Sequence, residues 1–222
     1  MRLSEQDHAR VSAAVTAAET TTDGEIVTIV ADRSDAYHDV GLHWAVLAML
    51  LALAVIALFP DFYMGLLDRL VGWQHVWTTR ELLTILLAVL TIKFLAVRFI
   101  LAWMPLRMAL TPRATKARRV RRRAIMLFKV GAEKRTASRT GVLLYLSLAE
   151  HRAEIVADEA IHGKVTPETW GEAMVALIDA VRAGRPGEGM AAAVARIGAV
   201  LAEHFPHTGT DPNELPDRLI EL

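Results

Sequence analysis

Apolar positions along the chain group into runs of three kinds, and each kind predicts a different element. Residues 25–31 and 142–148 are short apolar runs, the first rich in β-branched side chains, and both have the length of a buried strand. A third run around residues 155–157 alternates with Glu154 and Asp158, which predicts a strand with one polar face near a sheet edge. The short connection between the last two strands indicates a β-hairpin.

Helical spacing of apolar residues marks the segments before, between and after these strands. Residues 4–18 form an amphipathic pattern that begins at Ser4, a residue type favoured at helix N-caps. Residues 115–133, 166–184 and 187–204 each keep their apolar side chains on one stripe. A strand, a long helical connection and a second strand make a parallel pair. The expected fold is therefore α/β, with a small mixed β-sheet sandwiched by α-helices.

Two longer apolar runs have the length of a membrane span. Residues 42–59 contain no charge, and residues 82–104 are as apolar except for Lys93 and Arg98. A helix of about 20 residues crosses a hydrocarbon core of about 30 Å. The two runs predict a two-helix transmembrane hairpin inserted into the α/β domain. The 53% share of hydrophobic residues, higher than in ordinary soluble domains, is concentrated in this hairpin.

The hairpin interrupts the predicted domain because it lies between the first two strands. Residues 62–73 lie between the two spans and have the pattern of a short helix in the membrane interface, with Trp73 and Trp77 at the depth of the aromatic belt. The chain is therefore expected to divide into residues 1–41 as the first part of the domain, 42–104 as the hairpin, 105–206 as the remainder of the domain, and 207–222 as a tail packed on it.

Basic residues crowd the segment that follows the second span. The cluster comprises Arg107, Arg113, Lys116, Arg118, Arg119, Arg121, Arg122 and Arg123. The loop between the spans offers only Arg69 and Arg80, so the positive-inside rule predicts that the cluster is cytoplasmic. Two crossings then put both termini in the cytoplasm, as in a multi-pass protein of the bacterial inner membrane.

The basic cluster also predicts a partner. Each basic group near an anionic leaflet contributes about 1 kcal/mol to membrane binding, so the seven arginines of the cluster are expected to contact anionic lipid headgroups. Nucleic acid is not expected, because no aromatic residues interleave with the arginines to stack on bases. The alternative is that these charges set the topology and nothing else.

Lys93 and Arg98 lie within the second apolar run. A charge at mid-span costs about 2.5–3.5 kcal/mol, and the first span contains no acid that could pair with it. If the span ends near Val97, Arg98 lies at the interface and Lys93 can snorkel to it from one turn inside. The alternative hypothesis is that they contact an acidic or carbonyl partner, either in another membrane protein or in a second copy of the chain.

Composition and motifs exclude several kinds of chemistry. The chain has no cysteine, which excludes disulfides, thiol catalysis and cysteine-ligated metals, and its formal net charge is zero. No phosphate-binding loop, nucleophile elbow, zinc-protease motif or EF-hand spacing occurs, and the histidines are scattered singly. These motifs therefore assign no catalytic residue, and no organic cofactor is expected.

Acidic residues occur where strand ends are expected to meet. If the third strand is antiparallel to its neighbours, its end at Asp158 and Glu159 lies near the start of the first strand at Asp23 and Glu25. Carboxylate oxygens are the ligands that Ca²⁺ prefers, so these four acids are candidate ligands for Ca²⁺ or another divalent metal. The alternative is that they are solvated charges. A second candidate group at the opposite end of the sheet comprises Asp32, Asp35, Glu150 and His151.

Three motifs carry a family resemblance. They are the GEIV strand at residues 24–27, the GVLLYLS strand at 141–147 with its return strand from Arg152 to Ile155, and the segment EGMAAAVARIGAVLAEHFP that starts at Glu188. Together they resemble the TPM domain family, also called the TPM phosphatase or DUF477 family. The closing NELPDRLIEL at 213–222 resembles a bacterial membrane-associated branch of that family.

The resemblance implies an α/β sandwich with a small central sheet. Some relatives are reported as calcium binders or acid phosphatases, and others as assembly or maintenance factors for membrane complexes. We expect an integral inner-membrane protein with a cytoplasmic TPM-like domain that binds a partner and supports a membrane complex without catalysis. The alternative is a divalent-metal-dependent acid phosphatase or a calcium-binding module.

Overall fold

The computed structural model describes residues 3–72, 75–131, 140–209 and 215–222. The chain forms two compact units, one made of Met1–Asp35 with Arg113–Leu222 and the other of Ala36–Pro112. We call the first unit the domain and the second the hairpin. The hairpin begins and ends several residues outside the predicted 42–104, because its first helix starts earlier and a short extra helix follows its second.

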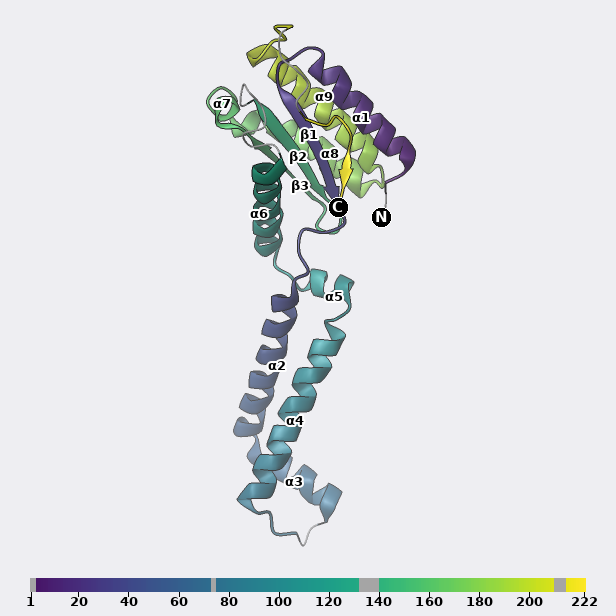
Figure 1. Ribbon diagram of the computed structural model, residues 1–222. Helices are drawn as coiled ribbons and strands as arrows, with labels where there is room; N and C mark the ends of the chain where they lie inside the picture. The colour runs from purple at the N-terminus through teal and green to yellow at the C-terminus, as the bar shows by residue number, and fades with distance from the viewer. Residues whose placement is uncertain (1–2, 73–74, 132–139, 210–214) are drawn as a thin grey trace. The chain divides into compact units, whose positions relative to one another are not determined.

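A four-stranded mixed sheet forms the centre of the domain (Figure 1). Its strands are β1 (Glu25–Ala31), β2 (Gly141–Ser147), β3 (Arg152–Ala157) and β4 (Ile220–Glu221), in the order β3-β2-β1-β4. The strands β1 and β2 are parallel over their whole length, with Glu25 opposite Gly141 and Ala31 opposite Ser147. The strands β2 and β3 are antiparallel. The predicted α/β class, the parallel pair and the hairpin with β3 at the sheet edge are therefore confirmed.

Helices cover both faces of the sheet, as Figure 1 shows. They are α1 (Glu5–Glu19), α8 (Gly171–Arg182) and α9 (Pro186–His204) on one face and α6 (Arg113–Gly131) on the other. Side chains alternate along each strand, so Ile26 and Val30 pack in the first core whereas Val27 and Ile29 pack against α6. This double burial explains why β1 and β2 are apolar on both faces.

Local signals fix where the helices begin and end. Ser4 caps α1 as predicted, and Asp7 completes a capping box with it. Gly184 ends the α8 region with a left-handed φ of 77°, which a residue with a side chain rarely adopts. Gly198 lets α9 approach α1, because a Cβ at that position would lie 2.5 Å from the Cβ of Ala18.

The C-terminal segment completes the sheet. Leu215 and Leu219 are buried in the domain, and Ile220 and Glu221 form β4, which pairs in parallel with β1. A strand of two residues has no periodicity that a sequence pattern can reveal. The sequence therefore indicated a packed tail but not a fourth strand.

The hairpin unit contains two helices that are long and apolar enough to cross a membrane, α2 (His38–Leu58) and α4 (Thr79–Ile100). The second begins before the predicted residue 82, because Thr78 and Glu81 form a capping box. It ends before the predicted residue 104, because the chain turns there into α5 (Met104–Ala109), which has a proline in its first turn.

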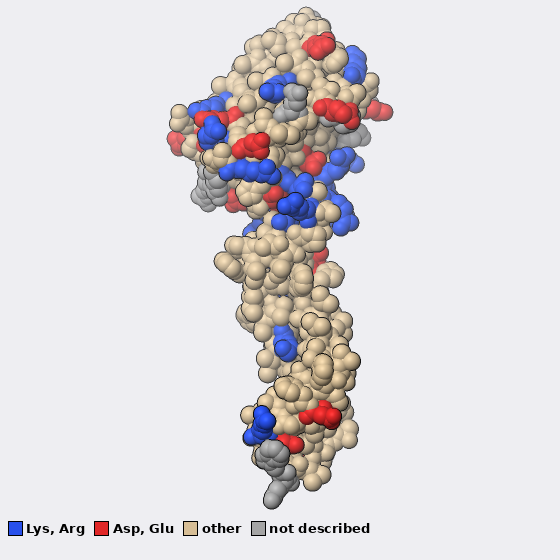
Figure 2. All heavy atoms as spheres, turned by 180° about the vertical axis from the view of Figure 1, so that it is seen from behind, with Lys and Arg blue, Asp and Glu red and all other residues tan. Residues whose placement is uncertain are grey.

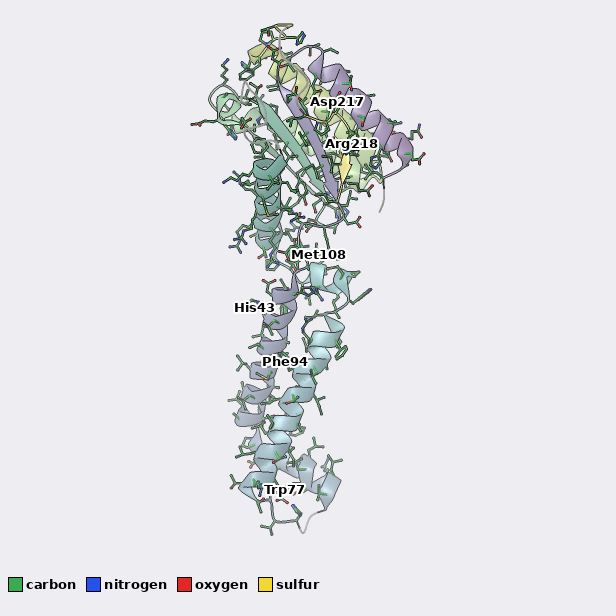
Figure 3. The ribbon with its side chains drawn as sticks, in the orientation of Figure 1. His43, Trp77, Phe94, Met108, Asp217 and Arg218 are labelled. Atoms are coloured by element: carbon green, nitrogen blue, oxygen red, sulfur yellow. The ribbon has the colours of Figure 1, made fainter. Side chains whose placement is uncertain are left out.

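Apolar side chains of the hairpin point outward along its helices (Figure 3). No residue of α4 is buried, and Leu51, Leu87 and Phe99 are more than half exposed. A soluble protein rarely exposes so continuous an apolar surface, whereas lipid chains would cover it. The helix α3 (Pro60–Val71) joins the two long helices, and Trp77 donates its indole N–H to the Asp68 carboxylate at 2.7 Å. Trp73 lies outside the described residues.

One buried polar group of the domain gives a test of the core. Thr28 lies fully buried in β1, and its hydroxyl has no hydrogen-bond partner among the described residues. Thr28→Val removes an unsatisfied polar atom at nearly constant volume, so we expect the free energy of unfolding to rise by about 1 kcal/mol. The measurement is chemical denaturation of the full-length protein in detergent.

Thr22→Val is the matched control for this substitution. Its hydroxyl donates to the Phe205 carbonyl at 2.5 Å and accepts from the Gly24 N–H at 3.0 Å. Loss of those bonds should lower the free energy of unfolding by about 1–2 kcal/mol. Equal destabilisation by both substitutions would contradict the assignment of Thr28 as an unsatisfied group.

Candidate functional site

The four acids of the predicted metal site lie at the end of the sheet where β1 and β2 begin. The Asp23 carboxylate accepts hydrogen bonds from Thr208 N–H at 2.9 Å and Thr208 Oγ1 at 2.6 Å, and these bonds hold the pKa of Asp23 below its ordinary value. Glu25 accepts from the Leu215 N–H at 3.2 Å. Asp158 accepts from the Gly141 N–H at 3.0 Å and precedes Glu159, the first residue of α7 (Glu159–His162).

Three of these acids, Asp23, Glu25 and Asp158, accept hydrogen bonds from backbone or side-chain donors at the strand ends. Among the residues that the structure describes, no group of three or more His, Asp or Glu side chains is placed to hold a metal ion. Asp23, Glu25, Asp158 and Glu159 therefore do not come together as a ligand set in this structure. Binding of Ca²⁺ or another divalent metal stays an untested prediction.

A buried polar network lies at the opposite end of the sheet, where β1 and β2 end. Ser147 donates its hydroxyl to Glu150, and Glu150 also accepts from the Ser34 N–H at 3.0 Å. The Ser34 and Tyr145 hydroxyls are 3.0 Å apart, and burial raises the pKa of Tyr145. The network connects the segment after β1 to the β2–β3 turn.

The second predicted acidic group is divided by these contacts. Glu150 is buried in the network, whereas Asp32 and Asp35 are exposed and Asp35 pairs with Arg119 at 3.0 Å. His151 is an exposed residue of the β2–β3 turn with a left-handed φ of 47°. Ser147 is fully buried, so the short contact with Glu150 holds the turn and offers no accessible nucleophile.

All but one of the arginines predicted to contact lipid lie on α6, where they are exposed or half-buried. In α6, Arg113, Arg118, Arg121 and Arg122 are exposed, and Arg119, Arg123 and Lys116 are half-buried. Arg119 pairs with Asp35, and Arg121 lies 3.9 Å from Glu154. Figure 2 shows basic side chains gathered over part of the domain face that it displays. Contact of these exposed arginines with anionic headgroups stays a prediction.

The remaining arginine, Arg107, is buried, so the prediction that it contacts lipid is wrong. Its side chain is only 3% exposed, and its guanidinium donates to the Leu101 carbonyl and the Ala36 carbonyl, both at 2.7 Å. His38 Nδ1 lies 3.3 Å from the same guanidinium. Arg107 therefore joins α5 to the end of α4 and to the start of α2 inside the hairpin unit.

Lys93 and Arg98 both lie on α4. Lys93 is exposed on an otherwise apolar surface, and Arg98 is half-exposed near the end of the helix at Ile100. The snorkelling interpretation and the partner hypothesis both stay predictions.

Two further features were not predicted from the sequence. A cavity of about 500 Å³ in the domain is lined by cationic side chains of Arg113, Lys116, Arg152 and Arg182, which come from three separate segments of the chain.

Glu19, at the end of α1, accepts the Ile26 N–H at 2.9 Å through one oxygen, while its second oxygen is buried without a hydrogen-bond partner among the described residues. Burial, followed by repulsion from Glu25 and Asp217, raises the pKa of Glu19 to about 8. Asp217 lies in the C-terminal segment (Figure 3).

Comparisons with known proteins agree with this fold. Residues 105–200 match the family model of the TPM domain. The chain is also similar to a solved structure, the NMR structure of the BA42 protein from the psychrophilic bacterium Bizionia argentinensis, with a TM-score of 0.57 at 15% sequence identity over 100% of this chain and 97% of that chain. At this identity the likeness shows the fold alone. No curated protein matches the chain.

The half-buried carboxyl of Glu19 predicts a pH dependence of stability. Because its folded-state pKa of about 8 lies above the ordinary value of 4.5, the folded protein holds a proton that the unfolded chain releases. Its contribution to stability is complete below about pH 4.5 and is lost as the pH rises through about 8. We expect Glu19→Gln to match the wild type at pH 5 and to be more stable at pH 8.5.

Thermal unfolding at these two pH values is the measurement, with Glu5→Gln on the exposed start of the same helix as the control. The control should leave the pH dependence unchanged. A Glu19→Gln protein that loses as much stability as the wild type between pH 5 and pH 8.5 would disprove the role of this carboxyl.

The hydrogen bonds of Arg107 are expected to stabilise the hairpin. Arg107→Gln removes charge-assisted bonds to Leu101 and Ala36, so we expect destabilisation of the hairpin by about 2–4 kcal/mol. Faster hydrogen exchange of the backbone around α5 measures this loss. Arg118→Gln, at an exposed position of α6, should leave the exchange unchanged, and equal exchange in both variants would contradict the assigned role.

Proposed function

We propose, from the TPM domain that the chain contains at residues 105–200, that this is an integral protein of the bacterial inner membrane whose domain binds a partner in the cytoplasm. In this proposal the domain supports the assembly or maintenance of a membrane complex and performs no catalysis. The observation that carries it is the position of the hairpin between β1 and β2, which are hydrogen-bonded neighbours in one sheet. The domain is therefore joined, through β1 and through α6, to both ends of a hairpin whose helices could span a membrane.

Integration into the membrane is supported by the surface of the hairpin. Two helices are long and apolar enough to cross a membrane, and their apolar side chains are largely exposed rather than packed in a core. Water is a poor solvent for such a surface, whereas lipid chains accommodate it. An even number of crossings keeps both parts of the domain on one side, as the shared sheet requires.

The cytoplasmic orientation rests on charge. The basic residues of α6 follow the second span after the short helix α5, whereas Arg69 and Arg80 are the only Lys or Arg residues between the spans. The outer arginines of α6, such as Arg118 and Arg122, are free to face anionic headgroups.

A binding role is favoured because the polar groups at both ends of the sheet bind one another. Ser147 and Glu150 hold the β2–β3 turn, and Asp23 holds Thr208. The partner is a membrane protein or a second copy of the chain, and exposed Lys93 on α4 is the group that would meet an acidic or carbonyl group of that partner.

A metal-dependent acid phosphatase is the second candidate, and the cationic cavity is the observation that favours it. Cationic side chains suit a phosphate group, although catalysis would also need a metal or an acid–base group beside it. Purified protein that hydrolyses p-nitrophenyl phosphate with divalent metals would replace the binding proposal with this one. Absence of turnover across pH 4–9 would remove the phosphatase.

Photo-crosslinking in cells tests the partner. A photoreactive phenylalanine analogue placed at Ile92 or Phe99, both exposed on α4, should give a discrete protein adduct. Lys93→Leu should reduce that adduct at least fivefold, whereas Lys129→Leu, on α6, should leave it unchanged. Crosslinks to lipid alone at both positions would remove the proposed membrane partner.

Thiol labelling tests the orientation, because the natural chain has no cysteine. Gly65→Cys in α3 should react with an impermeant thiol reagent in intact cells, whereas Ala149→Cys in the β2–β3 turn should react only after the inner membrane is opened. The reverse pattern would place the domain outside the cytoplasm. Ser138, another position suited to this test, lies outside the described residues.

A further inference from the structure

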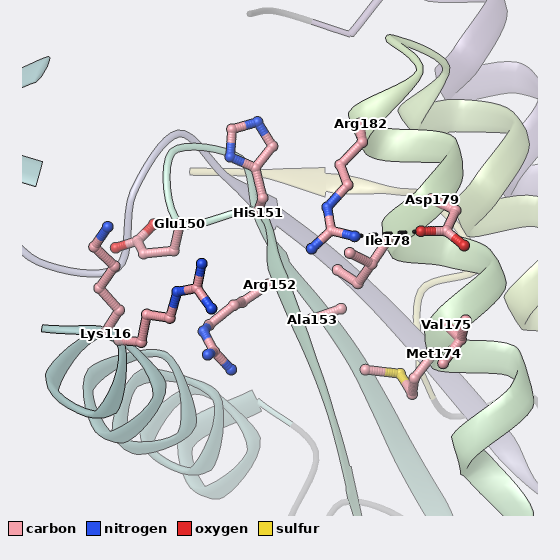
Figure 4. A pocket seen from close by; sticks show the side chains of 11 residues that line it. Lys116, Glu150, His151, Arg152, Ala153, Met174, Val175, Ile178, Asp179 and Arg182 are labelled. Carbon is pink, nitrogen blue, oxygen red and sulfur yellow. Dashed lines mark hydrogen bonds and ion pairs between the residues drawn. The ribbon is translucent and has the colours of Figure 1, made fainter. Parts of the chain in front are cut away.

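The cavity of about 500 Å³ lies between the start of α6, the β2–β3 turn and α8, all within the domain (Figure 4). Its volume is typical of sites that hold small molecules. Figure 4 shows the Arg182 side chain extending from α8 toward the strand that carries Arg152. The cationic residues of the lining come from three elements and comprise Arg113, Lys116, Arg152 and Arg182.

The charge of the lining favours an anion. Four cationic side chains and two carboxylates, Glu150 and Asp179, give a formal charge of 4 − 2 = +2 with His151 neutral. The Glu150 carboxylate is directed into the buried network with Ser147 and Ser34. Asp179 lies 3.4 Å from Arg182 at an exposed position, where water screens the pair. The cations therefore dominate the space between them.

The opposite wall of the cavity is apolar. On α8, Ala173, Leu177 and Val181 face the core. Met174, Val175 and Ile178 line the cavity, and Met174 also packs against the core. Val175 is 63% exposed. A free phosphate ion gains no hydrophobic free energy from an apolar wall, whereas the glycerol and first methylene groups of a lipid would cover this wall and bury its apolar surface. The lining thus suits a molecule with a phosphate at one end and apolar groups next to it.

The cavity lining lies close in the sequence to a helix that could span a membrane. Arg113 follows the last residue of α5 by four positions, and α5 follows α4, a helix of membrane-spanning length. We propose that the cavity binds one anionic phospholipid, with Arg152 and Arg182 on the headgroup phosphate and α8 against its glycerol. Arginine suits this role because its planar guanidinium donates two parallel hydrogen bonds to a phosphate. This site is independent of the partner proposed for the hairpin.

Binding of short-chain lipids to the full-length protein in a non-ionic detergent tests the site. The probes are dioctanoyl phosphatidylglycerol, dioctanoyl phosphatidylcholine and inorganic phosphate, and calorimetry reports each affinity. We expect phosphatidylglycerol to bind at least tenfold more tightly than either of the other two. The double variant Arg152→Gln with Arg182→Gln should weaken its binding about thirtyfold, as expected for the loss of two basic groups.

A matched pair on α6 separates this site from diffuse attraction by the basic helix. Arg118→Gln with Arg122→Gln removes the same charge outside the cavity and should weaken binding less than threefold. Val175→Asn, at an exposed position that should not disturb folding, adds no charge. It should weaken binding of phosphatidylglycerol at least tenfold and leave the affinity for inorganic phosphate within threefold.

Three results would overturn the proposal. Equal weakening by the two arginine pairs would reduce the site to general charge attraction. Inorganic phosphate binding as tightly as phosphatidylglycerol would assign the cavity to a soluble anion. Unchanged lipid affinity in Val175→Asn would remove the apolar wall from the site.

Discussion

The parallel ladder between β1 and β2 is the interaction on which the rest of the structure depends. Its two strands are separated in the sequence by the whole hairpin, so the sheet forms only if residues 36–112 bring their own ends together. A flexible loop of that length would cost about 2 kcal/mol more to close than a loop of ten residues. The hairpin avoids this cost because α2 and α4 pack against each other, and Arg107 binds both Ala36 near the start and Leu101 near the end.

The same ladder determines where polar groups can be placed. Because helices cover both faces of β1 and β2, the centre of the sheet is apolar and hydrogen-bonding side chains collect at its two ends. At one end Glu25 and Asp158 accept backbone N–H groups, and at the other Glu150 connects the β2–β3 turn to Ser34. These carboxylates stabilise the ends of the strands, which explains acidic residues that in the sequence resembled metal ligands.

Much of this fold could be predicted because its elements are long and periodic. The runs at 25–31 and 142–148 indicated buried strands, and the positions of the two apolar helices were correct to within four residues. The sequence did not reveal the role of Arg107, because it belongs to a basic cluster whose other members are exposed or half-buried. Spacing in the sequence reports the face of a helix, and it cannot report a carbonyl contributed by another turn of the chain.

The cavity was unpredictable for a related reason. Arg113, Arg152 and Arg182 come from a helix, a strand and another helix, and only the packing of α6 and α8 on either side of β3 brings them together. Glu19 shows the same limit, since its burial depends on β1 and on the C-terminal segment that carries Asp217. Sites that are assembled from distant segments become visible only when the sheet order is known.

Nuclear magnetic resonance of the full-length protein in lipid tests the split sheet most directly. The register places Ile29 opposite Tyr145 and Thr28 opposite Leu144, so through-space contacts are expected between the backbones of these residues. Contacts across both pairs, with residues 36–112 in place, are the predicted result. Absence of contacts between the two segments, or pairing of residues 25–31 with another strand, would contradict the account.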